Sequence, residues 1–201
     1  MIRFEPAPEP EDFDENVRRP GLAWLAKNPP PKRPKDYWTK GATHALAVAF
    51  RDLCAYCAVE NIPGTVDHYR SCKNTRELAY EWSNYRYCSD RINQCKGTAD
   101  EQILDPFEVG DDWFEVLIPS MQLVPTDAIP AQHRDRAIFT LKRLQLIGGR
   151  KDDWIVRSRR SWYHMYESGG LTLERLEEKA PLIARAIRKR DAAQAETRPE
   201  V

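Results

Sequence analysis

The chain of 201 residues has no long apolar run, and charged residues make up 31% of it. Because a membrane-spanning helix needs about 20 mostly apolar residues, we expect no membrane span. The first residues, 1–6, lack the apolar segment of a secretory signal, which favours a cytoplasmic location. None of the nine glycines belongs to a phosphate-cradling loop, so nucleotide hydrolysis by a P-loop is not expected.

An excess of either charge is also missing, because 31 lysines and arginines balance 31 aspartates and glutamates. No global basic field would therefore draw the chain to nucleic acid. The charges are unevenly spread: residues 1–16 are acidic, whereas residues 64–97 and 150–160 are rich in Lys and Arg. Such patches can hold phosphates, although a solvated face is the usual meaning of a charge run.

The most informative residues lie between positions 65 and 97, where Asp67-His68 is followed by Asn84, Asn93 and Lys96-Gly97. This set suits cleavage of a phosphodiester bond with one divalent cation. His68 would deprotonate a water, and Asp67 and Asn93 would offer oxygen ligands to Mg²⁺ or Mn²⁺. Asn84 would tie the loop that carries His68 to the rest of the site. Taken singly, a His is more often a surface or core residue, and Asn residues often form turns.

Three basic side chains are candidate contacts to substrate phosphates: Lys96, Lys73 and Arg86. Lys96 follows Asn93 by three residues, a spacing that places both side chains on one face of a helix. A basic side chain near a hairpin can also simply face solvent, so that alternative stays open for all three.

The order Asp-His, Trp-x-Asn-Tyr and Asn-x-x-Lys-Gly resembles the HNH endonuclease family over roughly residues 50–110. The resemblance implies a ββα-metal core, with strands at 64–68 and 79–87 and a helix at 89–97. It also implies catalytic roles for four residues: His68, Asp67, Asn84 and Asn93. Asp67 and Asn93 would hold the metal ion.

Five cysteines, an odd number in a chain expected in the cytoplasm, argue against a disulfide framework. Many HNH proteins carry a zinc knuckle formed by two CxxC pairs. Cys54 and Cys57 form a first pair here, but Ile92 stands where a Cys of the second pair is expected. One interpretation is a structural zinc site, which needs four converging ligands, here Cys54, Cys57, Cys88 and Cys95. The other is that these small side chains are buried and pack as apolar residues.

The predicted fold class is α+β, a small ββα core embedded among helices. Residues 1–36 hold more than half of the fifteen prolines, and we interpret them as an extended arm. Residues 37–125 would contain the core, a preceding helix and two following strands near 113–118 and 121–124. Residues 126–201 would be helical, with segments at 134–146, 151–167 and 173–193, the last interrupted by Pro181.

A similarity to the small HNH proteins of bacterial defence operons lies in Asp105-Pro106-Phe107, where Asp105 would lie near the metal ligands or form a turn. The resemblance implies a metal-dependent endonuclease acting on DNA in an anti-phage defence complex, with a co-encoded ATPase as partner. The neutral charge and the apolar anchors Phe13 and Trp24 in the arm agree with such a partner. Two alternatives stay open: a catalytically silent module that binds protein or nucleic acid, and an RNA-directed nuclease.

Overall fold

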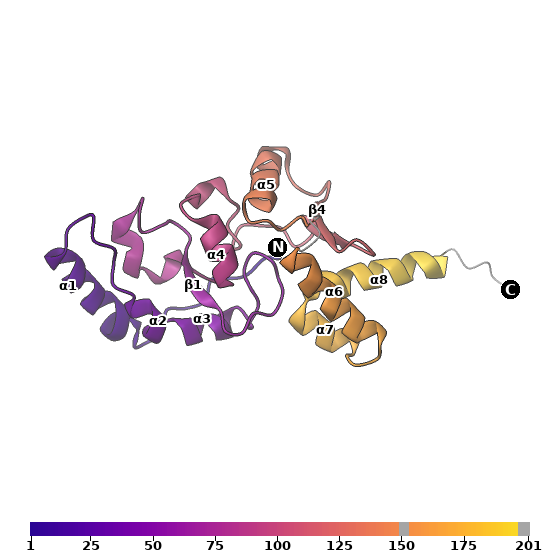
Figure 1. Ribbon diagram of the computed structural model, residues 1–201, viewed down its shortest axis with the longest axis horizontal. Coiled ribbons are helices and arrows are strands. Elements are labelled where there is room, and N and C mark those ends of the chain that lie inside the picture. The colour runs from indigo at the N-terminus through magenta and orange to yellow at the C-terminus, as the bar shows by residue number, and fades with distance from the viewer. Residues whose placement is uncertain (149–152, 197–201) are drawn as a thin grey trace.

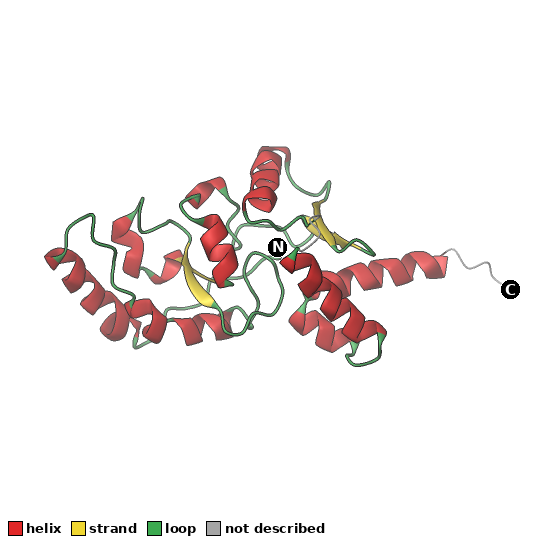
Figure 2. Cartoon of the chain, in the orientation of Figure 1, coloured by secondary structure: helices red, strands yellow, loops and turns green. Residues whose placement is uncertain are grey.

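The computed structural model describes residues 1–148 and 153–196. Helices dominate, and the molecule is drawn out along one axis, with the N-terminal helices near one end and the C-terminal helices near the other (Figure 1). Two antiparallel sheets of two strands each complete the described part (Figure 2). The fold class is therefore α+β, as the sequence predicts.

In chain order the elements are η1 (Asp14–Arg18), α1 (Arg19–Lys27), α2 (Tyr37–Gly41), α3 (Thr43–Ala49), β1 (Thr65–His68), η2 (Arg76–Tyr80), η3 (Trp82–Asn84), β2 (Tyr85–Cys88), α4 (Asp90–Lys96), η4 (Asp100–Gln102), β3 (Phe114–Leu117), β4 (Gln122–Pro125), α5 (Ala131–Arg143), α6 (Trp154–Glu167), α7 (Leu173–Lys179) and α8 (Pro181–Glu196). The break between α7 and α8 falls at Pro181, as predicted. The predicted helix at 151–167 is seen from Trp154 onward, and its first positions, 151 and 152, lie outside the described residues.

β1 pairs antiparallel with β2, and His68 lies opposite Tyr85. α4 follows β2 almost directly. Ser89 caps its first turn through a side-chain hydrogen bond, and Gly97 ends it at a φ of 57°. This order of strand, strand and helix agrees with the prediction. The second strand is shorter than expected because residues 76–84 form the short 3-10 helices η2 and η3, so Asn84 precedes the strand.

The N-terminal residues belong to the core. Phe4, Phe13 and Val17 are buried, and the Phe4 amide donates a hydrogen bond of 3.0 Å to the Pro106 carbonyl. The expectation of an extended arm at residues 1–36 is therefore corrected. Apolar side chains recur between the prolines, and their burial stabilises the packed arrangement over an extended one.

The C-terminal helices join the same core. Arg159 of α6 is buried, and its Nη1 donates hydrogen bonds of 3.0 Å to the carbonyls of Met121 and Leu146. One cluster of buried apolar residues extends from Met1 to Leu182 in α8, so the three regions expected from the sequence share a core. Within residues 1–148 and 153–196, no helix combines the length and apolar character needed to cross a bilayer.

Candidate active site

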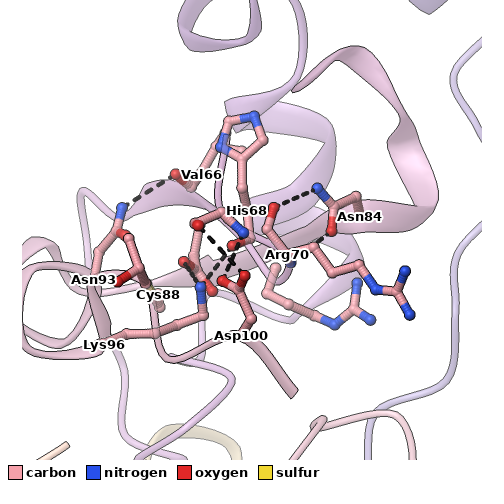
Figure 3. A network of polar contacts seen from close by, with 12 residues as sticks. Val66, His68, Arg70, Asn84, Cys88, Asn93, Lys96 and Asp100 are labelled. Carbon is pink, nitrogen blue, oxygen red and sulfur yellow. Dashed lines mark hydrogen bonds and ion pairs between the residues drawn. The ribbon is translucent and has the colours of Figure 1, made fainter. Parts of the chain in front are cut away.

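The candidate site lies around β1, on which α4 packs (Figure 3). Neighbouring residues of a strand point to opposite faces. The Asp67 carboxylate faces Lys96 of α4, whereas the His68 ring contacts Trp38 and Tyr85 and points away from Lys96 in Figure 3. Among the described residues, Asp67 and His68 thus use different partners and form no ion pair with each other.

Asp67 is held in a buried network. Its Oδ1 lies 3.0 Å from the Nζ of Lys96, and its Oδ2 accepts a hydrogen bond of 2.6 Å from the Tyr56 hydroxyl. The Lys96 ammonium also donates to the backbone carbonyl of His68, at 2.6 Å. Asp67 and Lys96 are each only 1% exposed. These partners are needed because an uncompensated charge in the interior is strongly unfavourable.

The structure corrects two of the predicted phosphate contacts, Lys96 and Arg86, because both side chains are buried in ion pairs. Arg86 faces Asp105 through an Nε–Oδ1 contact of 2.8 Å and an Nη2–Oδ2 contact of 2.5 Å. Its guanidinium also lies 3.7 Å from the centroid of the Phe107 ring. Asp105 accepts a hydrogen bond of 3.0 Å from the Phe107 amide, so it forms a turn and anchors Arg86 as well. Lys73 is exposed and stays a candidate.

The His68 ring is packed edge-on between two aromatic rings, with centroid distances of 4.5 Å to Trp38 and 4.9 Å to Tyr85. Its Nε2 lies 2.8 Å from the Ala79 carbonyl oxygen. Because a carbonyl only accepts, Nε2 carries the proton, and Nδ1 of the neutral ring is left as the acceptor. Burial lowers the pKa of His68 below its usual 6.5, against the opposing effects of the Ala79 carbonyl and the Asp67 carboxylate. The imidazole is therefore neutral at pH 7.

Asn84 fastens the loop that follows β1. Its Oδ1 accepts a hydrogen bond of 2.8 Å from the Arg70 amide, and its Nδ2 donates to the carbonyls of Arg70 and Leu78, at 3.0 and 3.1 Å. Its own carbonyl accepts from the Tyr69 amide at 2.8 Å. These bonds tie the loop in the way the sequence assigns to Asn84, and its effect on catalysis stays a prediction.

Asn93 reaches from α4 to β1, where its Nδ2 donates to the Val66 carbonyl at 3.2 Å. Asp100, which the sequence analysis missed, fastens the far part of the loop after β1. Its carboxylate accepts hydrogen bonds of 2.8 Å from the Ser71 amide and from the Asn74 side chain. Asp100 is 7% exposed. No sequence pattern marks it, because its partners are 26 and 29 residues away along the chain.

The four cysteines considered for zinc do not form a metal-binding group. Cys54, Cys57 and Cys88 are buried in the apolar core, and Cys95 is half-buried on α4. Within the described ranges, no group of three or more His, Cys, Asp or Glu side chains is placed to hold a metal ion. Burial raises the pKa of Cys54, but hydrogen bonds, foremost with Cys57, outweigh it and lower that pKa to about 7. Three of the four cysteines are thus buried as the second interpretation expects, and zinc binding stays a prediction.

The divalent cation that the resemblance implies does not fit these side chains in their present arrangement. The donors available on this side of β1 are the Asp67 carboxylate and the Asn93 carboxamide, both of which suit Mg²⁺ chemically. However, both carboxylate oxygens are already engaged, one of them by an ammonium group. An ammonium group 3.0 Å from this carboxylate would repel a divalent ion placed there, and this is why the arrangement does not fit one.

The structure thus places Lys96 on the Asp67 carboxylate and joins Asn93 to β1 at the Val66 carbonyl. The His68 ring has other partners, and Asn84 fastens the loop that follows β1. A scan against protein-family models and a search of curated proteins both find no match for this chain. The chemistry of the site is therefore the basis for assigning a function.

Proposed function

We propose that this chain hydrolyses phosphodiester bonds of DNA, with His68 as the general base. The observation that carries the proposal is the state of the imidazole. It is neutral at pH 7, it is oriented by the Ala79 carbonyl through Nε2–H, and it keeps Nδ1 as a proton acceptor. A general base needs this combination of a fixed tautomer and a pKa below the working pH.

In the reaction, a water proton passes to Nδ1 of His68 while the hydroxide attacks phosphorus. The bond to the 3′-oxygen breaks, and that oxygen takes a proton from solvent. The protein's part in this step is to hold the ring: Trp38 and Tyr85 fix its position, and Ala79 fixes its tautomer. Positioning of this kind is a large part of what general-base catalysis requires.

The local order of elements supports the same proposal. β1, β2 and α4 follow one another as the HNH resemblance implies, and the loop after His68 is tied down by Asn84. Asn93 comes from the helix to the strand that carries Asp67. Dependence on Mg²⁺ or Mn²⁺ is part of the proposal because the HNH resemblance implies it, although the arrangement of Asp67 and Lys96 does not fit such an ion.

Incubation of the purified chain with supercoiled plasmid, single-stranded DNA and RNA tests the proposal. Each substrate is offered with Mg²⁺, with Mn²⁺ and with EDTA. We expect nicking of the plasmid that EDTA removes. Cleavage of RNA in preference to DNA would redirect the proposal to the RNA-directed alternative, and activity that survives EDTA would remove the metal from it.

A co-encoded ATPase is the proposed activator. The chain has no net charge, so it has little attraction of its own for DNA, whose phosphates supply most non-specific affinity. We expect weak cleavage by the isolated chain and strong stimulation by the partner. Phe13 is buried in the core and is therefore not proposed as part of the contact, whereas Leu22 of α1 is 46% exposed. Cleavage rates with and without the partner decide, and full activity of the isolated chain at physiological salt would falsify the dependence.

A second function is favoured by one observation: Lys96 and Tyr56 close off the Asp67 carboxylate. This arrangement also suits a catalytically silent module that keeps the hairpin for binding protein or nucleic acid. If the chain is a nuclease, the His68→Gln variant should lose cleavage but keep DNA binding. A silent module should bind DNA or a partner protein, and cleave nothing even as the wild type with partner and metal added.

A further inference from the structure

We propose that a groove beside α6 binds the phosphate backbone of a single-stranded nucleic acid, with Arg157 and Arg160 as the phosphate contacts. The groove has a volume of about 560 Å³, and its lining includes four side chains of α6, namely Arg157, Arg160, Ser161 and His164. Pro119 and Met121, from the turn between β3 and β4, complete the lining together with Tyr163. The inference goes beyond the proposed function, because binding in this groove requires no cleavage chemistry.

The sequence of α6 places its basic side chains on one face. Positions 157, 160, 161 and 164 are separated by one to four residues and recur at the spacing of one side of a helix. The opposite side carries Ile155 and Arg159, which are both buried. Burial of that side fixes the rotation of α6 about its axis, so Arg157 and Arg160 are left exposed.

A buried hydrogen bond joins the turn to the helix that lines the groove. The Nη1 of Arg159 donates to the Met121 carbonyl at 3.0 Å, and Met121 is 1% exposed. The Met121 amide donates in turn to the Leu117 carbonyl at 2.7 Å, which closes the turn after β3. The backbone around the groove is therefore fixed before a ligand arrives, so binding does not have to order it.

Arg157 and Arg160 are exposed cations without a counter-ion. In the described part of the chain, no carboxylate forms an ion pair with either guanidinium. The carboxylates at the two ends of α6 are engaged elsewhere. Asp153 caps the helix by accepting a hydrogen bond of 3.4 Å from a backbone amide of the first turn, and Glu167 lies 3.1 Å from the Nη1 of Arg190. The fork of each guanidinium is thus available to a phosphate, whose geometry it matches.

The neighbouring helices show what a solvated arginine looks like in this chain. Arg175 of α7 is paired with Glu178, and Arg188 of α8 lies 2.5 Å from a carboxylate oxygen of Glu177. Both arginines are exposed, and each has an acidic partner close by. The face of α6 differs from these surfaces because its positive charge is left unneutralised.

The lining favours a nucleic-acid strand over a small anion. Arg157 and Arg160 are one helical turn apart, about 5–6 Å between their Cβ atoms, so two anionic groups of one chain can be held side by side. His164 adds an N–H donor in either tautomer. The Tyr163 ring, whose hydroxyl accepts a hydrogen bond of 2.7 Å from Arg190, offers an apolar surface to a base. Bases are free to stack on such a ring in a single strand, and an inorganic phosphate would leave it unused.

The groove is separate from the His68 site. α6 packs with α7 and α8, whereas β1, which carries His68, packs with α2, α3 and α4 (Figure 1). Only a chain-like ligand can occupy both places at once. Because the whole chain has no net charge, a local patch such as this one decides where a polyanion makes contact.

Binding of fluorescein-labelled single-stranded DNA to the full chain, measured by fluorescence anisotropy in EDTA over a series of salt concentrations, tests the inference. The first variant, Arg157→Gln/Arg160→Gln, removes both charges, and the second, Arg157→Lys/Arg160→Lys, keeps them. Arg175→Gln/Arg188→Gln is the matched control, because it removes two exposed arginines from neighbouring helices and changes the net charge equally. Circular dichroism establishes that each variant is folded.

We expect Arg157→Gln/Arg160→Gln to raise the Kd at low salt by at least about tenfold, since hydrogen bonds between charged groups are lost. The slope of log Kd against log salt should fall by roughly 1.4, which corresponds to about 0.7 for each phosphate contact with a single strand. The lysine variant should keep most of the affinity, and the control should bind as the wild type does.

Four results would overturn the inference. They are no binding by the wild type at low ionic strength, unchanged affinity in Arg157→Gln/Arg160→Gln, an equal loss in the control variant, and tighter binding of duplex than of single-stranded DNA. Competition supplies a further check. Inorganic phosphate or polyglutamate that displaces the DNA at an equal concentration of charge would show a general anion site and would also overturn it.

The outcome is separable from that of the proposed function. If the wild type binds DNA through Arg157 and Arg160 but cleaves no nucleic acid with metal and partner added, the groove stands and the nuclease does not. If the wild type cleaves DNA and Arg157→Gln/Arg160→Gln binds and cleaves it equally well, the nuclease stands and the groove does not.

Discussion

Replacing Arg86 with methionine should destabilise the fold without weakening contact with nucleic acid. The Arg86 guanidinium bonds Asp105 through contacts of 2.8 and 2.5 Å and donates to the carbonyls of Ser83 and Tyr85, at 2.8 Å each. The residue is 3% exposed, so Arg86→Met leaves Asp105 buried without a counter-charge. The variant therefore removes a partner of a buried pair and not a solvated surface charge.

The size of the effect follows from the burial of both groups. Removing one member of a buried, hydrogen-bonded ion pair costs about 3–5 kcal/mol. In a domain of this size, each kcal/mol lowers the melting temperature by roughly 2–4 °C, so the drop should be roughly 6–20 °C. The double variant Arg86→Met/Asp105→Leu should recover much of the loss, because neither charge then has to be desolvated.

Urea unfolding followed by circular dichroism and tryptophan fluorescence measures the change. Arg160→Met is the matched control, because Arg160 is exposed on α6 and the same substitution there should shift stability by less than about 0.5 kcal/mol. If Arg86→Met kept wild-type stability but lowered DNA affinity and its salt dependence, Arg86 would be a phosphate contact and the buried-pair reasoning would be refuted.

His68→Gln should lower the cleavage rate by ~10²–10⁴-fold, the usual effect of losing a general base; near wild-type cleavage by the folded variant would remove the assignment. The pKa of His68 is lowered in the folded state, so the unfolded chain takes up the proton first as the pH falls. The free energy of unfolding of the wild type should therefore decrease below pH 6.5. Urea unfolding at pH 7 and pH 5 should show a smaller decrease for His68→Gln than for the wild type. Asn84→Ala should lower the free energy of unfolding by about 2–4 kcal/mol, because three side-chain hydrogen bonds are lost. It should also speed proteolysis in the loop after β1, and unchanged proteolysis would show that Asn84 does not fix this loop. Deleting residues 1–17 should abolish cooperative thermal unfolding, since Phe4, Phe13 and Val17 are buried, whereas a folded truncation would exclude that segment from the core.

The parts of the fold that the sequence predicts well depend on local signals. Ser89 and Thr172 cap helices α4 and α7 through their side chains, and Pro181 separates α7 from α8. The alternation of apolar residues near 113–124 gives the hairpin of β3 and β4. Each of these features needs only a few neighbouring residues, so one sequence is enough to find it.

The parts that the sequence does not predict depend on distant partners. Arg86 meets a carboxylate 19 residues away, and Lys96 meets a carbonyl 28 residues away. From the sequence alone, both are basic side chains in a charged stretch, which is also what a phosphate contact looks like. The proline content of residues 1–36 similarly excludes a continuous helix but says nothing about burial, which the interleaved apolar side chains decide.

The Asp67-His68 pair shows the same difference between features set by neighbouring residues and features set by distant partners. A motif specifies which groups are neighbours in sequence, whereas a strand turns neighbours to opposite faces, so Asp67 meets α4 and His68 meets Trp38 and Tyr85. His68 is the last paired residue of β1. In the proposed hydrolysis, a phosphate that meets the imidazole would lie at the end of this strand, beside the loop that Asn84 and Asp100 fasten. In that proposed reaction, the hydrogen bonds that fix the loop would serve catalysis as well as the stability of the fold, because the loop directly follows His68.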